Sequence, residues 1–107
     1  MSKYDKLTRD LIEVREASIE AGKSEDGGTA NLDSVFLRLP HWREKMVIEA
    51  IKRAGLYCRG KTQWIGTGYM ISPVGCGQGN SRARAMKAMK KVLDDKGYDA
   101  LGYYKMD

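Results

Sequence analysis

Residues 55–62 read GLYCRGKT, which fits the phosphate-loop pattern G-x-x-x-x-G-K-[ST] at every fixed position. Such a loop holds nucleotide phosphates when a buried strand precedes its glycines and a helix follows its lysine, because the helix N-terminus and the loop N–H groups act together. Here the apolar pattern predicts a helix that ends at Gly55 and a strand after Thr62, which is the reverse order. We therefore interpret Gly60 as a turn residue and do not expect nucleotide hydrolysis.

A second glycine-rich stretch, GCGQGN at residues 75–80, precedes the basic run SRARAMKAMKKVL at residues 81–93. Glycines can bring backbone N–H groups close to an anion, and a helix that starts near Ser81 adds the positive end of its dipole. We expect this segment to contact nucleic-acid phosphates, together with two residues of the preceding hairpin. The predicted contact residues are Arg59, Lys61, Gly77, Gly79, Ser81, Arg82, Arg84, Lys87 and Lys91. The alternative is a flexible connection followed by a solvated basic helix face.

Within this segment, the spacing of five residues resembles a known RNA-binding family. Gly77, Gly79, Ser81, Arg82 and Ala85 are spaced like the loop and second helix of the double-stranded RNA-binding domain. This local resemblance implies that basic residues at the helix start hold phosphates across a groove.

The apolar pattern predicts the element order β-α-β-β-α-β after the first helix, with VFLRLP (35–40) in the first strand and GYM (68–70) in the third. This order is similar to that of the RNA recognition motif. That second resemblance implies aromatic rings, exposed on the sheet, that stack on bases. Phe36 and Tyr69 are the candidate rings. Both resemblances imply a polyanionic partner.

The sequence predicts neither a catalytic group nor a metal site. His41 is the only histidine, and no spacing brings it to Cys58 or Cys76 as the base for a thiolate nucleophile. The C-x-x-C and H-x-x-x-H pairs typical of zinc sites do not occur in the chain. We expect a protein that is not an enzyme and that uses no cofactor.

Charge is distributed unevenly along the chain. The 107 residues carry a formal net charge of +5, but residues 38–96 contain thirteen Lys or Arg against four Asp or Glu, between mildly acidic flanks. Such a basic segment favours nucleic acid, or a nucleic-acid-handling protein, as the partner. The charged N-terminal residues and the lack of a long apolar run predict no signal peptide and no membrane span, and therefore a cytoplasmic protein.

These residues need a scaffold, and the apolar periodicity predicts one. Residues 1–21 form an N-terminal helix, 22–31 a flexible loop, and 32–107 a basic α+β domain. Within that domain we expect a strand over 33–40, a helix over 41–54, two strands in 56–72 that turn at GKTQ (60–63), a helix over 81–96 and a strand over 100–106. The order β-α-β-β-α-β matches a ferredoxin-like antiparallel sheet with two helices on one face. Whether the first helix packs on this domain stays open.

Two classes of function fit this scaffold. The first is a small non-enzymatic module that contacts nucleic-acid phosphates through the glycine-rich loop and the basic helix. The second is a phage-type inhibitor, similar to anti-CRISPR proteins, that docks on a nucleic-acid-handling enzyme. Exposed aromatic residues would serve such docking, and the candidates are Trp64, Tyr103 and Tyr104.

Overall fold

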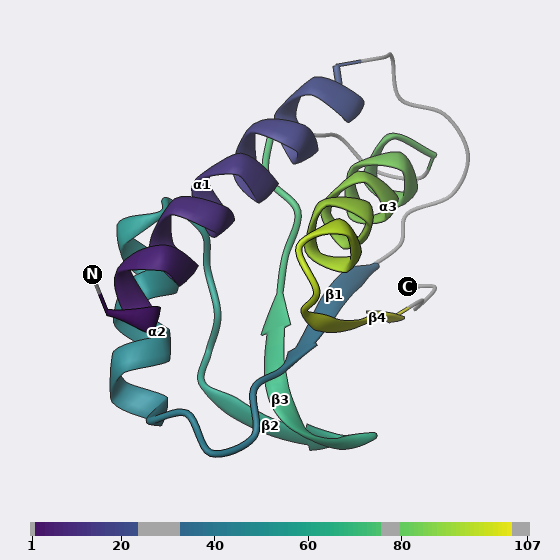
Figure 1. Ribbon diagram of the computed structural model, residues 1–107. Helices are drawn as coiled ribbons and strands as arrows, with labels where there is room; N and C mark the ends of the chain where they lie inside the picture. The colour runs from purple at the N-terminus through teal and green to yellow at the C-terminus, as the bar shows by residue number, and fades with distance from the viewer. Residues whose placement is uncertain (1, 24–32, 76–79, 104–107) are drawn as a thin grey trace.

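The computed structural model describes residues 2–23, 33–75 and 80–103, which form three helices and one four-stranded sheet (Figure 1). In chain order the elements are α1 (Lys3–Ala21), β1 (Ser34–Arg38), α2 (Glu44–Arg53), β2 (Lys61–Trp64), β3 (Gly66–Ile71), α3 (Asn80–Asp95) and β4 (Asp99–Tyr103). The strands lie in the order β2-β3-β1-β4, and each neighbouring pair is antiparallel. The predicted α+β fold, an N-terminal helix followed by β-α-β-β-α-β with an antiparallel sheet, is confirmed.

The sheet is built around β1, which pairs with β3 on one side and with β4 on the other. Because side chains alternate along a strand, the residues of β1 enter two different layers. Val35 and Leu37 belong to the main hydrophobic core, as do their β3 partners Ile71 and Tyr69. Phe36 is fully buried too, but it points to the opposite side of the sheet, which we call the outer face.

All three helices pack against the inner face of the sheet (Figure 1). Helix α1 contacts both α2 and α3, so it is an integral part of the core. The helix residues that share the core with the sheet are Leu7, Leu11, Val14, Val47, Ile51, Met86, Met89 and Leu93. At the start of α1, Ser2 Oγ accepts a hydrogen bond of 3.2 Å from the N–H of Asp5 and so caps the helix.

The β2–β3 hairpin turns at Ile65, and the predicted turn in residues 60–63 is wrong. Trp64 pairs with Gly66 across a single residue, and Gly66 takes a φ of +77°, which glycine adopts without strain. The predicted turn residue, Gly60, instead precedes β2, and most of the GKTQ stretch lies within that strand.

Other element boundaries differ from the predictions by a few residues. Helix α2 begins at Glu44 rather than at His41, because His41 has a φ of +70°, outside the helical range. Strand β1 ends at Arg38, before the predicted end at Pro40. Residues 104–106 of the predicted last strand lie outside the described residues.

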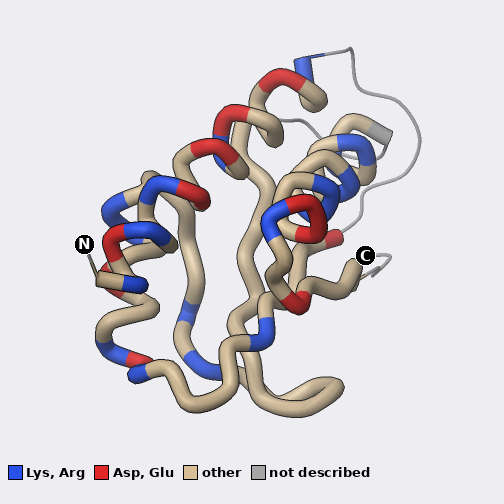
Figure 2. Tube along the Cα trace, viewed as in Figure 1, with Lys and Arg blue, Asp and Glu red and all other residues tan. Residues whose placement is uncertain are grey.

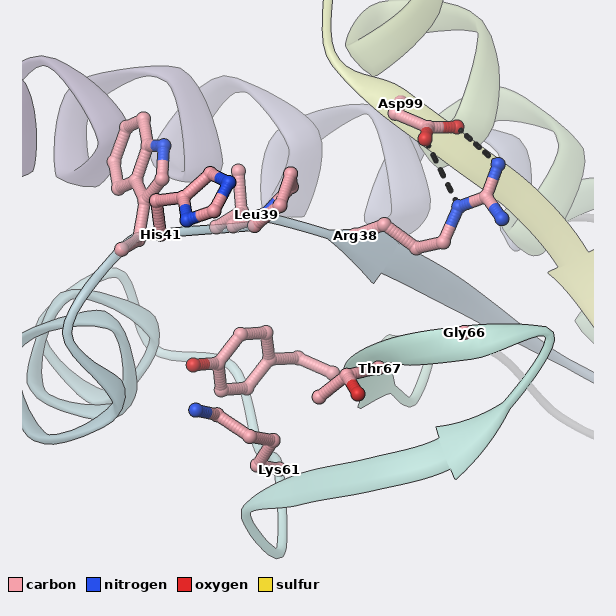
Figure 3. A pocket seen from close by; sticks show the side chains of 10 residues that line it. Arg38, Leu39, His41, Lys61, Gly66, Thr67 and Asp99 are labelled. Atoms are coloured by element: carbon pink, nitrogen blue, oxygen red, sulfur yellow. Dashed lines mark hydrogen bonds and ion pairs between the residues drawn. The ribbon is translucent and has the colours of Figure 1, made fainter.

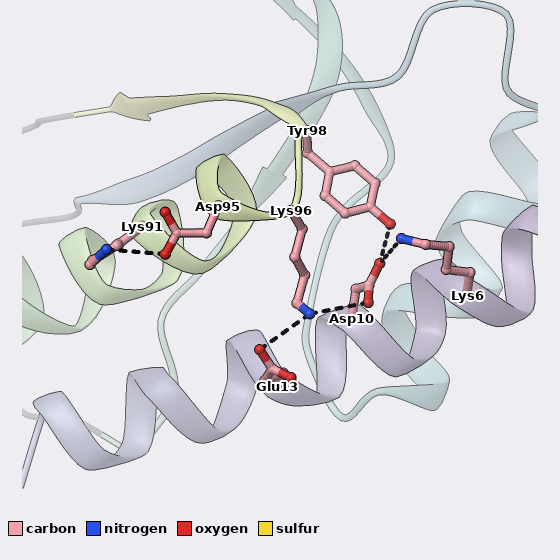
Figure 4. A network of polar contacts seen from close by, with 7 residues as sticks. All are labelled: Lys6, Asp10, Glu13, Lys91, Asp95, Lys96 and Tyr98. Atoms are coloured by element: carbon pink, nitrogen blue, oxygen red, sulfur yellow. Dashed lines mark hydrogen bonds and ion pairs between the residues drawn. The ribbon is translucent and has the colours of Figure 1, made fainter.

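A buried carboxylate ties α1 to the junction between α3 and β4 (Figure 4). Asp10 Oδ2 accepts hydrogen bonds from Tyr98 Oη at 2.6 Å and from Lys6 Nζ at 2.8 Å. Lys96 Nζ lies 3.5 Å from Asp10 Oδ1 and 3.3 Å from Glu13 Oε2. Burial opposes ionisation of Asp10, but the hydrogen bonds from Lys6 and Tyr98 outweigh it, so the pKa of this carboxyl is lowered.

Replacing Asp10 should loosen α1 and change the acid sensitivity of the fold. We expect Asp10→Ala to lower the free energy of unfolding by about 2 kcal/mol at neutral pH, since two charge-assisted hydrogen bonds are lost. A lowered pKa stabilises the fold above the ordinary carboxyl range, and this contribution is lost as the pH falls below about 4. Urea unfolding between pH 3 and pH 7 measures both effects, and the difference between wild type and variant should shrink toward acid pH.

The matched control is Asp94→Ala, which removes a solvent-exposed carboxylate paired with Lys90 on α3. Its cost should stay below about 1 kcal/mol, as for other surface ion pairs. Equal costs for the two variants at neutral pH would contradict the role given to Asp10.

Candidate nucleic-acid interface

Three aromatic rings form a cluster on the outer face of the sheet. The rings of Phe36 and Trp64 have centroids 5.3 Å apart at 81°, and those of Trp64 and Tyr103 have centroids 4.9 Å apart at 88°. Both contacts are edge-to-face, the arrangement favoured by the quadrupoles of aromatic rings. Phe36 is fully buried at the base of this aromatic cluster, whereas Trp64 is 40% exposed and Tyr103 is half-buried. The cluster therefore presents ring surface to a ligand on a rigid base.

The ring of Phe36 fits because the neighbouring strand has no side chain at residue 68. A Cβ atom on Gly68 would lie 2.8 Å from Phe36 Cζ and 2.8 Å from the carbonyl oxygen of Leu37. Both distances are shorter than real Cβ contacts allow, and the backbone oxygen cannot move aside easily. Gly68 is thus required by the close approach of β3 to β1 under the aromatic cluster.

Beside the aromatic cluster, two arginines line a pocket of about 290 Å³, which we call the arginine pocket. Arg82, at the start of α3, donates from Nε to the carbonyl oxygen of Asp33 at 2.7 Å and from Nη2 to Ser34 Oγ at 3.4 Å. These bonds fix its guanidinium group at the N-terminal end of β1. Arg59 comes from the extended segment before β2 and is exposed. The lining residues are Ser34, Tyr57, Arg59, Thr62, Met70, Ser72, Arg82 and Tyr103.

The other predicted contact residues are distributed over several surfaces. Arg84 and Lys87 are exposed on α3, and Arg84 Nε lies 3.5 Å from the carbonyl oxygen of Ala21 at the end of α1. Lys91 is exposed and forms an ion pair of 3.0 Å with Asp95. Lys61 lines a different pocket from Arg59. Figure 2 shows Lys and Arg residues (blue) along α3, which packs beside α1 with its several Asp and Glu residues (red).

Ser81 has a structural role in the described fold. It is fully buried, and its hydroxyl donates to the carbonyl oxygen of Gly22 at 2.9 Å, which joins the start of α3 to the end of α1. This buried hydroxyl does not face a ligand, so we omit Ser81 from the interface. Gly77, Gly79 and Tyr104 lie outside the described residues.

Neither predicted stacking ring is exposed, because Phe36 is fully buried beneath Trp64 on the outer face and Tyr69 lies on the other face. Tyr69 pairs with Leu37 and points into the main core, where it is 1% exposed. Arg59 and Arg82 were predicted to contact the same ligand, but no sequence pattern places Tyr103 beside them, because these segments meet only through the strand order. Leu56 and Cys58 are buried while Tyr57 and Arg59 are exposed, and this alternation of apolar and polar residues is a sequence signal for the position of Arg59.

Among the described residues, we considered the Cys58 thiol and clusters of metal-binding side chains as possible reactive groups. Burial raises the pKa of the Cys58 thiol, whose Sγ lies 3.5 Å from the carbonyl oxygen of Gly60. A buried, protonated thiol is a poor nucleophile, so Cys58 lacks the environment of a reactive cysteine. Within the described ranges, no three His, Cys, Asp or Glu side chains gather to hold a metal ion.

Comparisons with known proteins give no relative: no family model, no curated protein and no solved structure matches this chain. No helix among the described residues has the length and apolar character needed to cross a bilayer. The outer face is therefore interpreted from its own chemistry.

Replacing Gly68 tests whether the base of the aromatic cluster is as tightly packed as the distances indicate. We expect Gly68→Ala to lower the free energy of unfolding by about 2 kcal/mol, the usual cost of overpacking a core. Denaturant unfolding measures the change, and near-ultraviolet circular dichroism reports the disturbed rings. Gln63→Ala, at an exposed position of β2, should stay within about 0.5 kcal/mol of wild type. A wild-type unfolding midpoint for Gly68→Ala would show that Phe36 can move aside.

Proposed function

We propose that this chain is a non-enzymatic module that binds single-stranded nucleic acid on the outer face of its sheet. One observation carries the proposal: the exposed ring of Trp64 and the half-buried ring of Tyr103 adjoin a pocket lined by Arg59 and Arg82. Proteins that hold single strands combine stacking rings with a positively charged path for the backbone. Both parts are present here on one surface.

In this arrangement the rings and the arginines have different tasks. A base that stacks on Trp64 or Tyr103 contributes about 1–3 kcal/mol with little dependence on its identity. The guanidinium groups of Arg59 and Arg82 contact phosphates, and this contribution weakens with salt because counterions are released. Serine and threonine hydroxyls around the pocket supply further donors to phosphate oxygens.

The basic residues of α3 act at longer range in this proposal. Helix α3 packs on the inner face, so a strand on the outer face does not also run along its exposed side. Arg84, Lys87 and Lys91 contribute to the positive field that attracts a polyanion, which is a salt-dependent effect on association rate. We therefore assign the contacts themselves to the outer face.

A protein-docking inhibitor is the second candidate, and it rests on apolar exposure around the same surface. Tyr57 is 61% exposed and Ile65 is 49% exposed, and both adjoin the residues of the outer face. Large exposed apolar side chains mark interaction surfaces when they gather together. Binding of Trp64 by a protein would depend weakly on salt, which separates the two candidates.

Trp64→Ala tests the stacking contribution. We expect fluorescence anisotropy with labelled single strands of RNA and DNA to show at least a tenfold loss of affinity, from the ring contact described above. The slope of log affinity against log salt concentration should not change. Trp64→Phe should restore part of the affinity, and Ile12→Ala, which removes an exposed apolar side chain on α1, should leave it unchanged. No binding of any strand at low salt would reject the proposal and favour the inhibitor.

Arg59→Ala tests the phosphate contact. We expect weaker binding to all sequences and a salt slope that is smaller by about one unit, since one phosphate contact is lost. Lys52→Ala removes one exposed positive charge on α2 that does not line the arginine pocket, and it serves as the control. If both variants change the slope equally, the binding reflects overall charge and no particular site.

A further inference from the structure

A pocket of about 620 Å³ lies where β1 and β3 separate (Figure 3). The two strands pair only as far as Leu37 and Tyr69, and beyond that point β1 continues beside β4 while the hairpin bends away. Figure 3 shows Arg38 and His41 on one wall, with Lys61 and Thr67 on the other. We call this cavity the hairpin pocket, and its volume suits one small organic group.

The charges of the hairpin pocket are largely balanced. Arg38 donates from Nε and Nη2 to the two carboxylate oxygens of Asp99, at 2.9 and 3.1 Å. The N–H of Lys61 donates to Glu44 Oε2 at 3.0 Å, so an acidic group lies beside this wall as well. An anionic ligand therefore finds little net attraction, whereas a neutral ring with both donors and acceptors finds partners of both kinds.

The walls also offer apolar contact to a ring. Leu39, Pro40 and Trp42 line the hairpin pocket from the segment that follows β1. This segment is shaped by His41, whose φ of +70° is the only positive value among the described residues other than glycine. Side chains rarely adopt such a conformation, and functional sites are enriched in it.

A buried hydroxyl group adds a hydrogen-bonding atom to the pocket wall. Tyr69 lines the hairpin pocket, and its hydroxyl is buried without a hydrogen-bond partner among the described residues. Burial first, and then the charge of Glu44, raise the pKa of Tyr69, so the hydroxyl keeps its proton. Its cross-strand neighbour is Lys61, whose exposed side chain can move aside to admit a ligand atom.

The hairpin pocket adjoins the aromatic cluster. Gly66 lines the pocket and is the residue that pairs with Trp64. Arg38 spans the same region, since its Nη1 donates to the carbonyl oxygen of Ile65 at 3.0 Å. Arg38, Asp99 and Gly66 share the outer-face register of Trp64, whereas Lys61, Thr67 and Tyr69 lie on the core side of the strands. A base of a strand that stacks on Trp64 thus reaches the pocket through the opening between β1 and the hairpin.

We propose that the hairpin pocket takes one unstacked nucleobase of the strand bound on the outer face. The inference rests on the proposed function and adds to it a base-reading site. A nucleobase is planar and close to neutral, and its edge carries both donors and acceptors, which match the lysine, hydroxyl and carboxylate groups of the lining. Single-stranded recognition commonly reads a splayed base in this way.

The test uses single strands of about eight nucleotides in which one abasic site is moved along the sequence. Anisotropy titrations should find one position where loss of the base lowers affinity about tenfold, and where the four bases differ by about fivefold or more. A uniform, small loss at every position would overturn the base-reading site while binding itself persists. Absence of binding by all strands would instead reject the proposed function, so the two failures are distinguishable.

Tyr69→Phe assigns the effect to the pocket. This variant removes the hydroxyl and keeps the ring in the core, so we expect the advantage of the preferred base over the abasic site to fall about fivefold. Affinity for the strand with the abasic site should be unchanged. Thr8→Val, which removes a hydroxyl bonded to Tyr4 within α1, is the control and should keep the full advantage. If the preferred base keeps its full affinity advantage over the abasic site in Tyr69→Phe, that base binds outside the hairpin pocket.

Discussion

Strand β1 is buried on both of its faces, and this double burial couples the helical core to the outer face of the sheet. Val35 and Leu37 enter the core under the helices, while Phe36 supports the rings of the outer face. The strand pairs along both edges, so its backbone is satisfied only when β3 and β4 are in place. The core and the proposed binding surface therefore share one strand, so a substitution that displaces β1 disturbs both.

The order of helices and strands could be predicted from the sequence, because each element carries a clear apolar period and most end at glycine or proline. The positions of the candidate site could not. Trp64 lies on β2 at one edge of the sheet and Tyr103 on β4 at the other, and their rings meet over Phe36 of β1. This contact depends on pairing between distant segments. Tyr69 was assigned to the wrong face for a related reason: a shift of one residue in a strand reverses every side chain.

The packing of α1 on α3 also changes how the charge of the chain should be understood. In the sequence, the basic middle segment stands apart from the acidic flanks. In the fold, the acidic residues of α1 lie beside the lysines and arginines of α3 (Figure 2). Neighbouring opposite charges reduce each other's field within a Debye length. The arginine pocket opens on the other face of the sheet, although Arg82 reaches it from the start of α3.

The contact between Asp10 and Tyr98 joins positions that are 88 residues apart in the chain. During synthesis on the ribosome, α1 emerges long before the helix and strand that bury its apolar side. Until then the leucines of α1 stay exposed to solvent, where they can bind chaperones or aggregate. Contacts between such distant segments also slow the search for the native state. The rate at which the later part of the chain is delivered thus bears directly on the yield of folded protein.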